Sequence, residues 1–248
     1  MHAASPLLAT LLAALIGMPS AASVPCGGAF PAFRDAMETE AVARGADPAR
    51  AARFFDGVRQ DPAVLRADRA QGIFQLPFVE FSRRLISRNR IENGRLNAER
   101  HDAVFDLIET EHGIPRGVLL AFWALETDYG AVQGDYNTVN ALMTLAHDCR
   151  RPELFRPQVL SALELSSRGG LDPDRTTGAW AGEIGMVQML PSDILRFGAD
   201  ADGDGRVSLK RSVPDALVSG ANMIRGYGWR PGEPWLQEVV APQGLDWS

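Results

Sequence analysis

Apolar residues recur at intervals of three and four along most of this chain, the spacing that places side chains on one face of an α-helix. The pattern predicts helices over residues 30–45, 77–86, 97–112, 115–128, 153–167, 191–197 and 214–227, and one that Asn137 caps and Arg150 ends. No stretch alternates convincingly at period two, which is typical of a half-buried strand. We therefore predict an all-α fold with at most a minor hairpin.

Capping residues and turn signals predict where the helices begin and end. Asp47-Pro48 and Asp61-Pro62 each place a capping carboxylate before a proline, which suits the first helical turn. Asn93-Gly94 is a turn signal, so we expect a break there. Residues 178–191 are rich in small side chains and predict tight turns with short helix.

Glu126 lies in the middle of an apolar face of the helix predicted over 115–128. At about 100° per residue, this face carries Val118, Leu119, Phe122, Trp123 and Leu125. Burial disfavours a charged carboxylate, so we expect Glu126 to keep its proton near neutral pH, as a general acid for glycosidic cleavage must. Asp128 projects to nearly the opposite side of the helix. A core glutamate paired with an arginine fits the same position, and the helix geometry leaves that alternative open.

Residues 200–207 match the first eight positions of a calcium-binding helix–loop–helix loop, with carboxylates at positions 1, 3 and 5 and glycine at position 6. Position 12 is Arg211 instead of the usual bidentate glutamate, and Asp215 is the candidate to supply the missing carboxylate. We predict a structural calcium clip whose ligands are Asp200, Asp202, Asp204, the Arg206 carbonyl and Asp215. The alternative is an acidic turn that binds nothing.

Residues 1–22 are typical of a signal peptide, because an apolar run over 7–16 is followed by small residues that suit cleavage after Ala22. The segment before that run carries only His2, so an uncleaved anchor or a misassigned start remains an alternative. Pro25 directly before Cys26 is a poor context for lipidation. We expect an exported, periplasmic protein that is not a lipoprotein.

The two cysteines, Cys26 and Cys149, most simply pair in an exported protein, although both could also be free and buried. No cysteine and histidine spacing indicates a metal site. At 248 residues and 46% hydrophobic side chains, the chain can bury a substantial core. Its net charge of −6 argues against a nucleic-acid partner, which favours a basic face. We expect a monomer.

Several motifs occur in a specific order: ALETDYG at 124–130, GAWAGEIGMVQMLPS at 178–192, the acidic loop, SVPDAL at 212–217, and Gly228-Trp229. Together they resemble the B-type lytic murein transglycosylases, which belong to the lysozyme-like superfamily. The resemblance covers residues from about 30 to about 235. It implies a lysozyme-like helical catalytic domain over 23–248, with an EF-hand-like calcium loop inserted at about 200–215.

The resemblance also implies an enzyme that cleaves the β-1,4 bond between N-acetylmuramic acid and N-acetylglucosamine in peptidoglycan glycan strands without water. The product ends in 1,6-anhydromuramic acid. Glu126 then performs both proton transfers, the substrate's N-acetyl group stabilises the intermediate, and no organic cofactor is needed. The residues agree with this, because the predicted helix carries no obvious second carboxylate beside Glu126.

Four more positions match the family pattern with less force. Gln188 corresponds to a glutamine that contacts the sugar, and Tyr129 to an aromatic residue after the catalytic helix. Arg150 and Arg151 correspond to an arginine pair whose charge would suit the carboxylates of the stem peptide. Purely structural or solvated roles remain open for all four.

Three features depart from the family pattern. Ala179 stands where serine is frequent, Met223 stands where an aromatic residue is common, and many relatives continue beyond the position of Ser248. These departures keep two other functions open. One is a hydrolytic muramidase, and the other is a non-catalytic protein that binds peptidoglycan as a scaffold.

Overall fold

The computed structural model describes residues 24–70, 76–234 and 236–245, so the predicted signal peptide at 1–22 lies outside the described residues. The part of the chain that is described is helical, with two short strands. The helices are α1 (Phe30–Ala43), α2 (Pro48–Phe55), α3 (Pro62–Arg69), α4 (Phe78–Leu85), α5 (Arg88–Arg100), α6 (Asp102–His112), α7 (Arg116–Thr127), α8 (Thr138–His147), α9 (Pro152–Ser167), α10 (Pro191–Phe197) and α11 (Val213–Gly226). The all-α prediction is confirmed.

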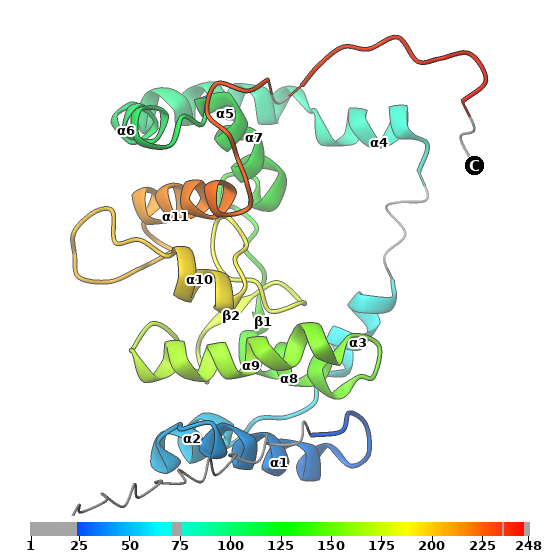
Figure 1. Cartoon of the computed structure of the whole chain (residues 1–248), viewed down its shortest axis with the longest axis vertical. Coiled ribbons are helices and arrows are strands. Elements are labelled where there is room, and N and C mark those ends of the chain that lie inside the picture. The colour runs from blue at the N-terminus through cyan, green and yellow to red at the C-terminus, as the bar shows by residue number, and fades with distance from the viewer. Residues whose placement is uncertain (1–23, 71–75, 235, 246–248) are drawn as a thin grey trace, which may run out of the picture.

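A small antiparallel hairpin is the minor strand content that the sequence allowed. Strands β1 (Tyr136–Asn137) and β2 (Thr177–Gly178) pair with Tyr136 opposite Gly178. Figure 1 shows the helices stacked in successive layers, from α1 and α2 through α8 and α9 to α10 and α11, and then to α5, α6 and α7. The hairpin lies in the middle of this stack.

Two clusters of buried apolar side chains hold the layers together. One includes Phe33, Phe54 and Leu142 and joins α1, α2 and α3 to α8 and α9. The other includes Phe105 and Trp123 and joins α6, α7 and α11. The loop 178–190 takes part in both clusters, because its first half packs into one and its second half into the other. This loop is therefore fixed between the two cores.

The predicted helix starts are confirmed where capping side chains were identified. Asp47 accepts a hydrogen bond from the Arg50 N–H at 2.9 Å, and Asp61 accepts one from the Ala63 N–H at 2.8 Å. Asn137 caps α8 through the Asn140 N–H at 2.8 Å. Such caps satisfy amide groups that the first helical turn leaves without partners.

The prediction of a turn at Asn93-Gly94 is wrong, because α5 continues through both residues. The helix predicted over 97–112 is two helices in the structure, since α5 ends at Arg100 and α6 begins at Asp102. Gly94 is buried where α5 meets Tyr129. A Cβ atom at Gly94 would lie 2.6 Å from the Tyr129 hydroxyl oxygen. The glycine therefore serves close packing between helices and not a turn.

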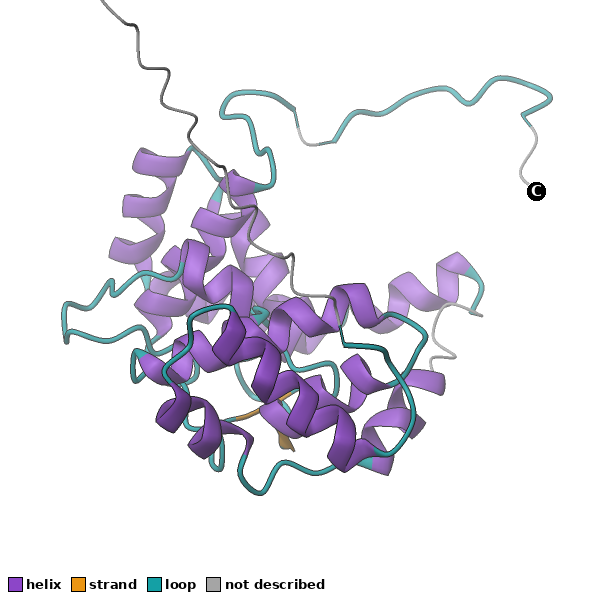
Figure 2. Ribbon diagram, turned by 60° about the horizontal axis from the view of Figure 1, so that its bottom comes forward, coloured by secondary structure: helices purple, strands orange, loops and turns teal. Residues whose placement is uncertain are grey.

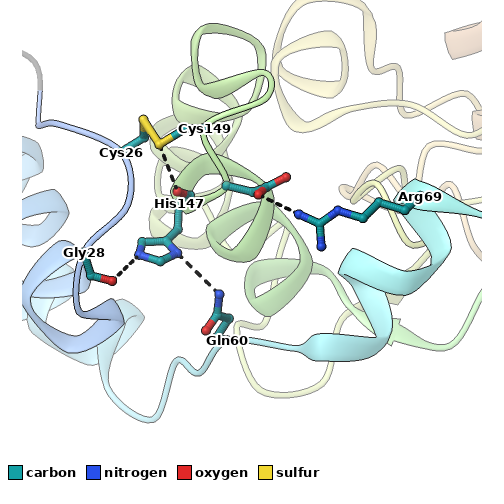
Figure 3. The surroundings of a disulfide bond; sticks show 7 residues. Cys26, Gly28, Gln60, Arg69, His147 and Cys149 are labelled. Carbon is teal, nitrogen blue, oxygen red and sulfur yellow. Dashed lines mark hydrogen bonds and ion pairs between the residues drawn. A yellow bond between two sulfur atoms is a disulfide. The ribbon is translucent and has the colours of Figure 1, made fainter.

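A disulfide joins Cys26 to Cys149, as predicted from the cysteine count, with 5.3 Å between the Cα atoms. Figure 3 shows His147 beside it, with its Nε2 at 3.1 Å from the Gly28 carbonyl oxygen and its Nδ1 at 3.4 Å from the Gln60 amide. The bridge and the Gly28 contact attach the segment before α1 to the end of α8, and the Gln60 contact attaches the link between α2 and α3 to it.

Figure 2 shows the same body from a second direction, with the short hairpin among the helices. Within the described ranges, none of the helices combines the length and the apolar composition needed to cross a membrane.

Candidate active site

Helix α7 places Glu126 one residue before its C-terminal end. The buried side of the helix is formed by Leu119, Trp123, Ala124 and Thr127, which recur at helical spacing. The next two residues, Asp128 and Tyr129, have left-handed backbone angles, with φ of 49° and 60°. Such angles are costly for non-glycine residues and persist only where packing imposes them. The chain therefore turns sharply just after Glu126.

Thr127 attaches the end of α7 to the loop 178–190. Its buried hydroxyl donates to the Met186 carbonyl oxygen at 2.6 Å and accepts from the Gly130 N–H at 2.9 Å. A buried hydroxyl that is fully bonded in this way resists movement. The residue next to Glu126 is thus held by a segment about sixty positions later in the chain.

Glu126 is not in the middle of the buried face, which corrects the sequence prediction. Leu119 and Trp123 are buried, whereas Glu126 and its neighbour Leu125 are open to solvent on one side. The reason is that α6 and α11 pack against α7 on the side of Leu119 and Trp123. Neighbouring protein atoms still crowd the Glu126 carboxyl group.

The pKa of Glu126 is raised above its ordinary value, in the direction expected from the sequence. The main cause is desolvation by burial, and the second is the negative charge of Glu183. Within the described residues, the Glu126 side chain has no hydrogen bond and no ion pair, so the alternative of a core glutamate paired with an arginine has no support. A free carboxyl group with a raised pKa is suited to donating a proton.

Glu183 is a second carboxylate that the sequence reasoning missed. It is the only charged residue in the stretch 178–192, and this isolation among small and apolar residues was the available signal. Its Oε2 atom is buried without a hydrogen-bond partner. Burial raises the pKa of Glu183, while its own backbone N–H and the charge of Arg151 lower it by less.

Asp128 forms an ion pair with α5 and is not a partner of Glu126. This agrees with the prediction that Asp128 projects to nearly the opposite side of the helix. The Arg90 Nε atom of α5 lies 2.5 Å from the Asp128 Oδ1 atom, and another Arg90 nitrogen donates to the Leu85 carbonyl oxygen at 2.8 Å. This ion pair braces the turn that follows α7.

Tyr129 and Gln188 both make internal contacts. The Tyr129 hydroxyl donates to the Arg90 carbonyl oxygen at 2.7 Å, and its ring packs edge-to-face on Trp123 at 5.3 Å. Gln188 has a left-handed φ of 48°, and its amide nitrogen donates to the Gly185 carbonyl oxygen at 2.8 Å. Tyr129 therefore connects α7 to α5, and Gln188 closes the tight turn of the loop 178–190.

Arg150 and Arg151 both pair with Asp68 of α3, whose side chain is almost completely buried. The sequence did not indicate this partner, because Asp68 lies about eighty residues earlier. The side chain of Arg150 is 51% exposed and that of Arg151 40% exposed, so each guanidinium keeps a face toward solvent. The two arginines thus neutralise the buried Asp68 carboxylate and still present N–H donors to solvent.

The acidic loop brings three of the predicted metal ligands together. Ligand oxygens of Asp200, Asp202 and Asp204 all lie within 4.8 Å of one another. The loop is folded by its own carboxylates, because Asp200 accepts from the Gly203 N–H at 2.8 Å and from the Gly205 N–H at 2.8 Å. Such local side-chain to backbone bonds are typical of Asp-rich turns.

Asp215 departs from the predicted ligand set, because it is buried and is not a member of the three-aspartate cluster. Its Oδ1 atom accepts from the Ala201 N–H at 2.8 Å, and its Oδ2 atom accepts from the Ser208 N–H at 2.7 Å. Asp215 therefore ties the two ends of the acidic loop to the start of α11.

Comparison with known proteins places this arrangement in a family. Residues 29–248 match the family model of the transglycosylase SLT domain. The membrane-bound lytic murein transglycosylase B of Escherichia coli strain K12 is 27% identical over 157 residues, which cover 63% of this chain and 43% of that protein.

Solved structures agree with this match. SltB3 from Pseudomonas aeruginosa, in complex with NAG-NAM-pentapeptide, has a TM-score of 0.80 and 34% identity, over 89% of this chain and 59% of that one. Slt35 from Escherichia coli, in complex with calcium, shares the fold with a TM-score of 0.73 at 24% identity, over 85% of this chain and 68% of that one. This chain spans about half the length of the curated relative. The family and helical fold indicated by the motifs are confirmed, and the chain belongs to the transglycosylase SLT domain family.

Proposed function

We propose that this protein is a peptidoglycan lytic transglycosylase and that Glu126 is its catalytic acid. The observation that carries the proposal is a carboxyl group without a partner, with a raised pKa, at a rigidly held helix end. SltB3, which covers most of this chain, has been solved in complex with NAG-NAM-pentapeptide and with NAG-anhNAM-pentapeptide. These ligands support a glycan strand as the substrate here.

In the proposed reaction, protonated Glu126 donates its proton to the glycosidic oxygen as the bond from that oxygen to the muramic acid C1 breaks. The Glu126 carboxylate then removes the proton of the C6 hydroxyl, whose oxygen bonds to C1. The product carries a 1,6-anhydro ring, no water is consumed, and Glu126 regains its proton. The substrate's N-acetyl group stabilises the charge at C1 between these steps, so the protein needs no nucleophile.

The substrate contacts are proposed on the same basis. Gln188 faces the sugar from the loop 178–190, while the solvent-facing donors of Arg150 and Arg151 suit the carboxylates of the stem peptide. The Tyr129 hydroxyl is bonded to the Arg90 carbonyl oxygen and its ring packs on Trp123. We therefore propose that Tyr129 shapes the site next to Glu126.

We also propose that the acidic loop binds calcium as a structural clip. Three carboxylates with ligand oxygens close together fit a hard cation, and the Arg206 carbonyl stands at the position where such loops supply a backbone ligand. The ion would neutralise like charges that otherwise repel. It takes no part in the proposed chemistry.

We further propose that residues 1–22 direct export to the periplasm, where peptidoglycan is accessible. The support is their sequence pattern together with the disulfide, which suits an oxidising compartment.

The experiment that tests the proposed function compares Glu126→Gln with the unaltered protein on purified peptidoglycan sacculi. We expect the unaltered protein to release muropeptides one water lighter than hydrolysis products, as measured by mass spectrometry. Glu126→Gln should lower their rate of release by at least about 100-fold, because general acid catalysis contributes that much. Glu99→Gln is the matched control, since Glu99 is exposed on α5.

Each alternative has its own result. Reducing-end products would identify a hydrolytic muramidase. Binding to sacculi without any soluble product, from a folded and calcium-loaded protein, would indicate a non-catalytic peptidoglycan-binding protein. Equal rates for Glu126→Gln and the control would remove Glu126 from the mechanism.

A further inference from the structure

Glu183 is a partly buried residue with one fully buried carboxyl oxygen, and neither the fold nor the proposed reaction gives it a task. Within the described residues no cation forms an ion pair with it, and its Oε2 atom has no hydrogen-bond partner. Asp148 also has one buried oxygen without a partner, but its other oxygen pairs with Arg69 at 3.0 Å. Buried carboxylates are normally bonded, because desolvating their charge is costly. A structural role does not account for Glu183.

Close packing holds the backbone of the segment that carries Glu183. The Glu183 carbonyl oxygen accepts from the Ala179 N–H at 2.9 Å, and a Cβ at Gly178 would lie 1.9 Å from that oxygen. A Cβ at Gly182 would lie 2.3 Å from Leu142 of α8. These close approaches require glycine at both positions, and they hold the segment that leads into Glu183 against the core.

The same segment is attached to the residue beside the catalytic acid. Met186, three positions after Glu183, accepts the 2.6 Å hydrogen bond from Thr127. The two carboxyl groups are close enough for the charge of Glu183 to raise the pKa of Glu126. Two neighbouring carboxyl groups cannot both ionise easily, and they titrate as a pair.

The other charged groups near this pair are engaged elsewhere. Arg151, in the link between α8 and α9, is the cation whose charge acts on Glu183, but it bonds to Asp68 of α3. Lys210, before α11, donates from Nζ to the Thr177 carbonyl oxygen at 2.6 Å. Neither cation is bonded to Glu183.

We propose, on the basis of the function proposed above, that Glu183 is a positioning residue whose carboxylate holds the catalytic proton on Glu126 until the glycosidic oxygen takes it. After that transfer, the two carboxylates face each other, and their repulsion makes Glu126 a stronger base toward the C6 hydroxyl. The proton returns to Glu126 when the anhydro ring closes. Glu183 itself gains and loses no proton over the cycle.

The test is a carboxyl-carbon NMR titration of the full chain labelled at its glutamates, with the Glu126 signal assigned from Glu126→Gln. Glu183→Gln keeps the shape of the side chain and removes its charge. We expect the Glu126 midpoint to fall by about half a pH unit or more. Glu99→Gln should leave it unchanged. An unmoved midpoint in Glu183→Gln would overturn the proposal.

Two further readouts separate this role from others. The alkaline limb of the rate profile on sacculi should move to lower pH in Glu183→Gln, because Glu126 loses its proton earlier, while the rate at acid pH stays near that of the unaltered protein. A loss that is equal at every pH, or reducing-end products that depend on Glu183, would assign Glu183 a direct part in the chemistry and refute the positioning role.

The reciprocal measurement remains available if Glu183→Gln does not fold. Glu126 is open to solvent, so Glu126→Gln should fold. In it the Glu183 midpoint should stay where it is, because Glu183 already ionises beside a neutral Glu126 in the unaltered protein, where its midpoint must lie below that of Glu126. A Glu183 midpoint that falls in Glu126→Gln, or that lies above the Glu126 midpoint in the unaltered protein, would overturn the proposal. If the unaltered protein makes no anhydro product but the two titrations are coupled, the result refutes the proposed function and leaves the interaction between Glu126 and Glu183 supported.

Discussion

Gly94 and Tyr129 meet at a single atomic contact that decides how close α5 and α7 approach. A Cβ at Gly94 would lie 2.6 Å from the Tyr129 hydroxyl oxygen but 3.6 Å from the ring carbon that carries it, which is an ordinary contact. The ring cannot easily retreat, because it packs on Trp123. The hydroxyl group alone therefore excludes a side chain at position 94.

A double substitution tests this contact. Alone, Gly94→Ala should lower the free energy of unfolding by about 1–3 kcal/mol, because it overpacks the interface and displaces the hydroxyl from the Arg90 carbonyl. In a Tyr129→Phe background the sign should reverse, with a gain of up to about 1 kcal/mol, since alanine favours helix over glycine. Urea unfolding of the four proteins measures this, and the same sign in both backgrounds would contradict it.

At the scale of elements, the local geometry of the acidic loop is set by its own side chains. Asp204 accepts from the Arg206 N–H at 2.9 Å through Oδ1, and asparagine would keep that acceptor while removing the charge. Replacing Asp204 with asparagine should therefore weaken the binding of the proposed ion more than it disturbs the fold of the loop.

Calcium should stabilise the unaltered protein by about 2.7 kcal/mol at one hundred times its dissociation constant, as calorimetric melting would show. Asp204→Asn should lose most of this response and melt normally in a chelator. Asp172→Asn is the control, because Asp172 accepts from the Asp174 N–H at 3.0 Å outside the cluster. A calcium response that Asp204→Asn retains in full would place the ion elsewhere.

The whole molecule is closed by the disulfide between Cys26 and Cys149, which links positions 123 residues apart. Replacing both cysteines with serine should lower the free energy of unfolding by about 2–5 kcal/mol, largely because the unfolded chain gains freedom. Guanidinium unfolding measures the loss, and reduction of the unaltered protein should reproduce it. A serine variant that unfolds like the oxidised protein would show that the bridge adds no stability.

The two halves of the molecule are joined through the loop 178–190, which packs into both apolar cores. Its glycines allow backbone approaches that a side chain would prevent, as at Gly178 and Gly182. The site proposed for catalysis lies where this loop meets α7. The stability of both cores therefore supports the position of Glu126.

The sequence by itself determined the features that depend on neighbours in the chain. Helical periodicity, the caps at Asp47 and Asp61, and the turns of the acidic loop all rest on contacts between residues a few positions apart. The cysteine pair was also predictable, since the chain has no other cysteines. The motifs from ALETDYG at 124–130 to Gly228-Trp229, taken together in their order and spacing, were sufficient to indicate the family.

Only the tertiary structure decided which groups from distant segments meet. It turned Glu126 toward solvent, brought Glu183 near it, and gave Arg150 and Arg151 a buried partner in Asp68. It also carried α5 through Gly94 and used Asp215 to hold backbone amides. Burial and charge pairing across the fold depend on how whole helices pack, and no local pattern in the chain records that packing.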